Sequence, residues 1–225
     1  MDWSAPIDLY CERAGTGLWS EPLNAWSNLA FPLAALYGAY VARARGQLRP
    51  VVVVLLGLAA LIGLGSWLFH VFANGWSEYA DVIPIWSFVA LYVLAAVHLL
   101  GGVAPGKLLR IVAAVAAAIV VLSLATSTDA GAEAAADPLN GSGQYLPALV
   151  ALCVFAVLSW QRRHPIRGWA LAATAVFAMS LVLRTVDLRF CALLPMGTHF
   201  MWHILNGAMV GLLLQGLIRT MPARE

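Results

Sequence analysis

Long apolar runs separated by short polar segments dominate this chain. Most runs approach the roughly 20 apolar residues that an α-helix needs to cross a lipid bilayer. The seven runs lie near residues 25–42, 50–72, 82–102, 108–125, 145–161, 168–184 and 198–219. The pattern predicts an all-α integral membrane protein whose seven-transmembrane helix bundle covers residues 25–219. An acidic extramembrane segment, 1–24, precedes the bundle, and a short tail, 220–225, follows it.

Composition agrees with this pattern. Of the 225 residues, 62% are hydrophobic and only 11% are charged. A soluble domain averages about 45–50% apolar and about 25% charged residues. The composition therefore excludes most soluble enzymes, and the net charge of +2 gives no reason to expect a nucleic-acid partner.

Basic and acidic residues lie at opposite ends of the predicted helices. Ten of the 13 basic residues lie on one side: Arg43, Arg45, Arg49, Lys107, Arg110, Arg162, Arg163, Arg167, Arg219 and Arg224. Ten of the 11 acidic residues lie on the other side. Because cytoplasmic loops carry an excess of Lys and Arg, we expect the N-terminus outside and the C-terminus in the cytoplasm, which requires an odd number of spans.

Four of the five histidines lie inside the apolar runs, where ionisable side chains are costly and usually functional. His98 is near the inner end of the third run, where a structural or interfacial role is expected, and the other three lie near the outer side. His70 is near the outer end of the second run, and His199 and His203 open the seventh. His199 and His203 are four residues apart and share a helix face. Three imidazoles at one depth can hold a catalytic zinc ion and leave a fourth position for water. The alternative is a polar crevice lined by hydrogen-bonded histidines.

Ser66 and Asp81 lie at the same depth as these histidines. Ser66 precedes His70 by four residues and shares its helix face. Asp81 opens the third run, where a carboxylate can accept a proton from zinc-bound water or orient a ligand histidine. Its alternative role is a helix N-cap. We expect Ser66 to donate a hydrogen bond to a substrate carbonyl.

Other polar residues have structural interpretations. Asn24, Ser27 and Asn28 share a face at the start of the first run, where we expect interhelical hydrogen bonds that support the metal site. Arg184 and Asp187 are three residues apart and are expected to pair on one helix face.

Three sequence blocks frame nearly the whole chain. The first is DLYCE…EPLNAWSN over residues 8–28, the second is SWLFH at 66–70 with Asp81 eleven residues later, and the third is THFMWH over 198–203. In this order the blocks resemble the alkaline ceramidases. This family lies within the seven-span membrane hydrolases, which also include the adiponectin-receptor-like proteins.

The resemblance implies a zinc-dependent intramembrane amide hydrolase. Zinc would be held by His70, His199 and His203, and Ser66 and Asp81 would serve catalysis. The implied reaction is cleavage of a ceramide-type membrane lipid to a sphingoid base and a fatty acid by zinc-activated water. The predicted orientation puts this site near the outer leaflet, on the periplasmic or lumenal side.

The resemblance also implies a calcium site in the acidic N-terminal segment, with Asp8, Glu12 and Glu21 at the matching positions. Calcium takes six to eight oxygen ligands, so backbone carbonyls and water would have to join them. One residue is inserted between Asp8 and the Cys-Glu pair of the family pattern, and Ala14 replaces an asparagine. The alternative is a solvated acidic segment paired with Arg13.

Cys11 and Cys191 are both on the predicted outer side, where disulfides form. The resemblance supports a bridge between them, and the alternative is two unpaired thiols. A bridge would hold the N-terminal segment beside the helix that carries His199.

Two rival functions remain open at this point. One is a related hydrolase of another acyl lipid, since zinc chemistry does not select the head group. The other is a non-catalytic seven-helix receptor or transporter with a structural zinc. Ser66 and Asp81 exceed what a structural three-histidine site needs, which favours an enzyme. No feature of the sequence indicates an oligomeric state.

Overall fold

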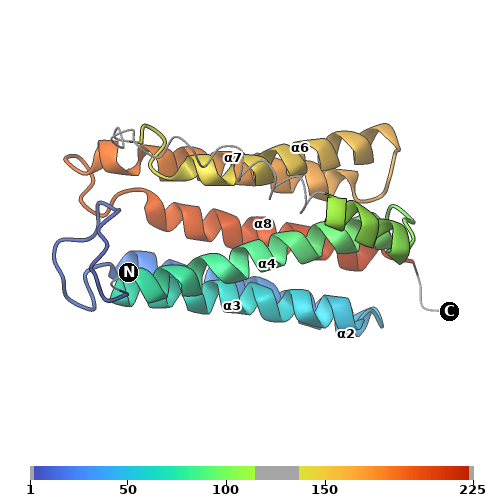
Figure 1. Ribbon diagram of the computed structural model, residues 1–225, viewed down its shortest axis with the longest axis horizontal. Coiled ribbons are helices and arrows are strands. Elements are labelled where there is room, and N and C mark those ends of the chain that lie inside the picture. The colour runs from blue at the N-terminus through green and yellow to red at the C-terminus, as the bar shows by residue number, and fades with distance from the viewer. Residues whose placement is uncertain (1–2, 115–136, 223–225) are drawn as a thin grey trace.

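The computed structural model describes residues 3–114 and 137–222. Its named helices are α1 (Pro22–Ser27), α2 (Ala30–Ala44), α3 (Pro50–Phe72), α4 (Gly75–Leu99), the 3₁₀ helix η1 (Ser142–Tyr145), α6 (Leu146–Gln161), α7 (Arg167–Phe190) and α8 (His199–Thr220). Across these described ranges there is no β-strand, only an isolated bridge between Pro6 and Asn74. The long helices lie side by side, with the N-terminal segment at one end of the bundle and the last turn of α8 at the other (Figure 1).

Five segments in the described part of the chain are long and apolar enough to cross a membrane. They are α3, α4, η1 together with α6, α7 and α8. The predicted run 50–72 matches α3, whereas α4 begins seven residues before the run at 82 and α7 continues six residues beyond 184. The all-α fold and the multi-pass membrane character are therefore confirmed.

The other two predicted spans are not among these five. The run 25–42 is divided between α1 and α2, and α2 has only 15 residues. Residues 105–114 are helical, but the rest of the run 108–125 lies outside the described residues. The count of seven spans and the orientation of the termini stay predictions.

Side-chain hydrogen bonds accompany the break between α1 and α2. The carbonyl of Asn24 accepts hydrogen bonds from Ser27 Oγ at 2.8 Å and from Asn28 Nδ2 at 2.9 Å. Side chains that bond a nearby carbonyl compete with the helical backbone pattern. At the break, the amide of Leu29 bonds the carbonyl of Trp26, three residues back, as in a 3₁₀ turn.

Helix α8 is the central helix of the bundle and carries two of the three histidines. In Figure 1 it lies between α6 and α7 on one side and α3 and α4 on the other. Within its most apolar window, 61% is buried, the largest share among the five candidate spans. Small residues allow close helix contacts: a Cβ on Gly207 would lie 2.5 Å from that of Ala30 in α2.

The start of α4 rules out the alternative role of Asp81 as a helix N-cap. The N-cap is Asn74, whose side chain accepts a hydrogen bond from the Ser77 amide in a capping box. Asp81 lies in the second turn of α4, so its carboxylate is not needed to start the helix.

Candidate metal centre

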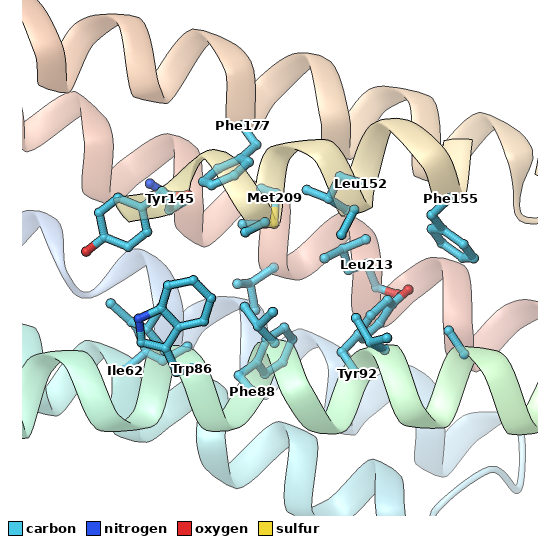
Figure 2. A pocket seen from close by; sticks show the side chains of 18 of the residues that line it. Ile62, Trp86, Phe88, Tyr92, Tyr145, Leu152, Phe155, Phe177, Met209 and Leu213 are labelled. Carbon is cyan, nitrogen blue, oxygen red and sulfur yellow. The ribbon is translucent and has the colours of Figure 1, made fainter. Parts of the chain in front are cut away.

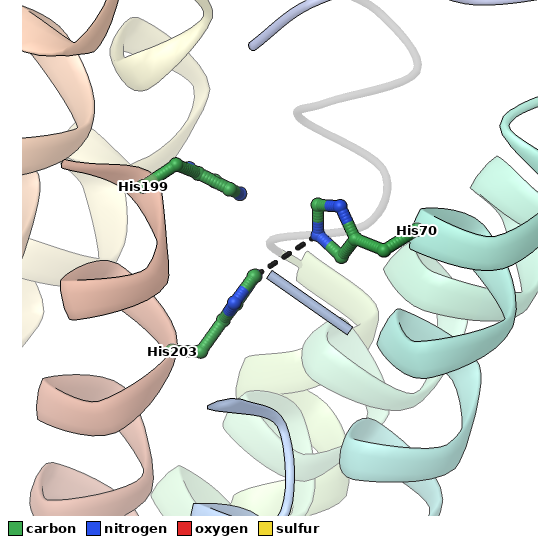
Figure 3. Close-up of side chains that lie close together, drawn as sticks. All are labelled: His70, His199 and His203. Carbon is green, nitrogen blue, oxygen red and sulfur yellow. Dashed lines mark hydrogen bonds between the residues drawn. The ribbon is translucent and has the colours of Figure 1, made fainter. Parts of the chain in front are cut away.

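The three predicted histidines meet at one end of the bundle. His70 lies in the last turn of α3, and His199 and His203 lie in the first two turns of α8. Figure 3 shows the three rings pointing toward one another. Their exposed fractions are only 1–2%, and one potential ligand atom from each lies within 4.8 Å of the others. This group can hold a metal ion.

The outward nitrogens of two rings are held by hydrogen bonds. His70 Nδ1 lies 2.6 Å from Glu21 Oε2, and His203 Nδ1 lies 2.8 Å from Ser27 Oγ. Metal-ligating histidines commonly use one nitrogen in this way, which fixes the ring orientation and leaves the other nitrogen for the metal. The contact of Ser27 agrees with the expectation that its helix face supports the metal site.

The inward nitrogens of His70 and His203 have the spacing of a ligand pair. His70 Nε2 and His203 Nε2 are 3.1 Å apart. Two nitrogens on one tetrahedral zinc ion, each about 2.0–2.1 Å from it, would be roughly 3.3 Å apart. The Nδ1 atom of His199 is buried and has no hydrogen-bond partner in the described residues. These residues fit zinc, because neutral imidazoles are among its usual ligands.

Tyr10 and Asp187 hold His199 in place, although the sequence did not indicate either role. The Tyr10 ring stacks on the His199 ring with centroids 3.5 Å apart. Burial raises the pKa of Tyr10 to about 12, so its phenol stays neutral. The Asp187 carboxylate accepts hydrogen bonds from the amides of Thr198 at 2.6 Å and His199 at 2.9 Å. It thereby caps the first turn of α8.

The expected pairing of Arg184 with Asp187 is wrong. The ion pairs found in the described residues do not include it. Asp187 lies beyond reach because it turns to the amides at the start of α8. The guanidinium of Arg184 instead donates to the carbonyl of Asn140 and to the Tyr10 hydroxyl. Arg184 is thus a buried cation among aromatic rings. The residues next to Arg184 in the sequence did not predict this arrangement.

The disulfide between Cys11 and Cys191 is present, as expected. The amide of Cys11 also donates to Asp187 Oδ2 at 3.0 Å. A covalent bond and a hydrogen bond therefore hold the N-terminal segment against the end of α7. This attachment brings Tyr10 to His199.

Ser66 and Asp81 lie beside the histidines on α3 and α4. Gly65 brings these two helices together, because a Cβ at this position would overlap the carbonyl oxygen of Ala80. Ser66 is buried, and its hydroxyl faces the Asp81 carboxylate. Asp81 Oδ1 is buried without a hydrogen-bond partner in the described residues. The structure thus leaves an acceptor atom of Asp81 open next to the metal group.

The three residues of the predicted calcium site have separate surroundings. Asp8 is exposed. Glu12 accepts hydrogen bonds from the amides of Leu23 at 2.6 Å and Asn24 at 2.8 Å, at the start of α1. Glu21 is buried at the metal centre, against His70. Calcium binding stays a prediction.

An apolar cavity of about 330 Å³ lies inside the bundle, and none of the three histidines lines it. Aromatic and aliphatic side chains from α4, α6, α7 and α8 surround it (Figure 2), among them Trp86, Phe88, Tyr92, Leu152, Phe155, Phe177, Met209 and Leu213. Three other lining residues lie one helical turn from a site residue: Ile62 from Ser66, Ile85 from Asp81 and Asn206 from His203. The cavity therefore continues along the helix faces that carry the site.

Comparison with known proteins identifies the family. No curated protein matches the chain. The family model described as Ceramidase matches residues 4–221, which is nearly the whole chain and includes all the residues of the metal centre. The chain therefore belongs to the ceramidase family.

Proposed function

We propose that this protein is a zinc-dependent intramembrane hydrolase that cleaves the amide bond of a ceramide-type lipid. The single observation that carries the proposal is the convergence of three buried histidines beside Ser66, Asp81 and an apolar cavity. His70, His199 and His203 would hold the zinc ion. When bound, zinc supplies a Lewis acid and lowers the pKa of a water molecule to about 7.

The chain's own residues have distinct parts in the hydrolysis. Water attacks the amide carbonyl carbon, the C–N bond breaks, and the nitrogen gains a proton to leave as the amine of a sphingoid base. The open Oδ1 of Asp81 is suited to accept the proton of the attacking water and to return it to the leaving nitrogen. The Ser66 hydroxyl, once turned to the substrate, donates a hydrogen bond to the carbonyl oxygen as negative charge develops on it.

The cavity suits the acyl part of the substrate. Its volume of about 330 Å³ falls at the lower end of the range of about 300–1,000 Å³ typical of ligand pockets. The lining is almost entirely apolar, so it favours a hydrocarbon chain over a polar group. With the chain in the cavity, the amide would lie near Ser66 and Asp81. By the charge pattern, we place this site near the outer leaflet.

Metal analysis and lipid turnover test the proposal together. Purified protein in detergent should contain one zinc ion per chain and should release fatty acid from ceramides, and a chelator should abolish the release. His203→Ala should lose both zinc and activity, because two histidines are too few ligands for a catalytic zinc ion. His98→Ala is the matched control, since His98 is exposed and far along α4 from the centre, and it should keep both.

The same assay separates the rival functions. Ceramides, N-acyl amino lipids and phospholipids should be compared as substrates. Hydrolysis of phospholipids without hydrolysis of ceramides would favour a related hydrolase of another acyl lipid. Stoichiometric zinc without turnover of any amide or ester lipid would favour a receptor or transporter with structural zinc.

A further inference from the structure

A buried arginine lies at the centre of the acidic N-terminal segment. The Arg13 side chain is only 6% exposed, and its Nε atom forms an ion pair with Glu21 Oε1. Its Nη2 atom donates to the backbone carbonyl of His70 at 3.1 Å, and its Nη1 atom donates to that of Gly15 at 3.3 Å. Arg13 therefore contacts both the carboxylate and the backbone that surround the first metal-centre histidine.

Glu21 connects Arg13 to the metal centre. Its side chain is 2% exposed, and Oε2 accepts hydrogen bonds from His70 Nδ1 and from Asn24 Nδ2 at 3.0 Å. A buried carboxylate is costly unless a positive charge and hydrogen bonds compensate it. Because Oε1 is occupied by Arg13 and Oε2 by His70 and Asn24, both oxygens of Glu21 are engaged.

The acidic residues of this segment do not fit a calcium ion. Calcium requires six to eight oxygen ligands, yet Asp8 is exposed and both oxygens of Glu12 accept hydrogen bonds from amides of α1. Among the residues that the structure describes, the three histidines are the one group of three or more His, Cys, Asp or Glu side chains that could hold a metal ion, and none of Asp8, Glu12 and Glu21 belongs to it. The guanidinium of Arg13 also places a positive charge against Glu21, where a calcium ion would be repelled.

We infer that Arg13 is a positioning residue that acts as a built-in cation, holding Glu21 against His70 so that this segment needs no calcium. The inference rests on the proposed zinc centre. Arg13 follows Cys11 by two residues, so the disulfide to Cys191 brings the cation to its place. The guanidinium fork can contact a carboxylate and carbonyls at once, which the single ammonium group of lysine does less well.

The test uses the full-length, zinc-loaded protein in metal-depleted buffer. Thermal unfolding is followed during a titration with calcium chloride, and zinc affinity is measured by competition with a chromogenic chelator. We expect calcium to leave the melting temperature of the wild type unchanged. Arg13→Gln should weaken zinc binding by about 10-fold or more, as loss of a partner behind a ligand histidine does.

Two further variants make the result specific. Arg13→Lys keeps the charge and should restore part of the zinc affinity. Arg45→Gln removes an exposed arginine at the other end of α2 and should bind zinc like the wild type. A saturable rise of the wild-type melting temperature with calcium would overturn the inference, and so would wild-type zinc affinity in Arg13→Gln.

The readouts keep this inference separate from the proposed function. If Arg13→Gln does not fold, the calcium titration of the wild type and the zinc affinity of Arg13→Lys still decide. Neither measurement uses lipid turnover, so a negative result would leave ceramide hydrolysis standing. Absence of zinc from the wild type would instead overturn the proposed zinc centre.

Discussion

The polar residues at the metal centre divide into those that fix the histidines and those with a free polar atom. Glu21 and Ser27 bond the outward nitrogens of His70 and His203, and these bonds orient the rings. Asp81 differs, because its buried Oδ1 has no partner in the described residues. This difference separates residues expected to affect zinc affinity from those expected to affect the chemical step.

Ser66 should affect turnover without affecting zinc. Replacement by alanine removes one hydrogen-bond donor to the developing oxyanion, a change that costs about 10²–10³-fold in turnover in other hydrolases. We expect Ser66→Ala to lose activity in this range while its zinc content, measured by elemental analysis, equals that of the wild type. Full activity in this variant would remove Ser66 from the mechanism.

At the scale of the helices, the close packing of α3 on α4 positions Ser66 beside Asp81. Gly65 makes this contact possible, since no side chain fits between it and the backbone of Ala80. Gly57 lies nearer the start of the same helix and has open space around it. Gly65 and Gly57 therefore allow a comparison between a glycine in a helix contact and a glycine with open space around it.

Gly65→Ala should both destabilise the protein and slow turnover. Its methyl group must push α4 away, and overpacking of this kind typically costs about 1–3 kcal/mol. Gly57→Ala should be neutral or stabilising, because alanine exceeds glycine in helix propensity by about 1 kcal/mol. Thermal unfolding and ceramide turnover check both variants. Equal behaviour of the two would show that the α3–α4 contact does not control the site.

At the scale of the whole molecule, the apolar cavity inside the bundle begins about one helical turn from the candidate metal centre. The N-terminal segment closes one end through the disulfide and the contacts of Asp187. Helices α4, α6, α7 and α8 supply most of the cavity wall. The size of this cavity should therefore limit the acyl chain that can be cleaved.

Leu152→Trp should shift the chain-length preference toward shorter acyl chains, because the larger side chain fills part of the cavity. Leu152 lines the cavity from α6 (Figure 2). Val150, two residues away on the same helix, is 60% exposed and does not line it, so Val150→Trp is the control. Turnover of ceramides of increasing acyl length measures the shift. An unchanged preference in Leu152→Trp would place the acyl chain elsewhere.

Much of the fold could be predicted from sequence because apolar runs and helices coincide in membranes, where each backbone group must be bonded within its own segment. The break between α1 and α2 was missed. It depends on the hydrogen bonds of Ser27 and Asn28 to the carbonyl of Asn24. Hydropathy does not indicate whether a polar side chain bonds its own backbone in this way.

The three histidines of the candidate metal centre could be identified from the sequence alone. The four-residue spacing of His199 and His203, and the place of His70 at the matching depth, follow from helical periodicity and the length of a span. Only the tertiary structure decided the partners of these histidines. The bonds of Asp187 to the start of α8 depend on how the end of α7 meets α8. The bonds of Glu21 to His70 and of Arg13 to both residues depend on how the N-terminal segment folds back over the bundle. That path is set by the disulfide and by long-range contacts, which leave no periodic pattern in the sequence.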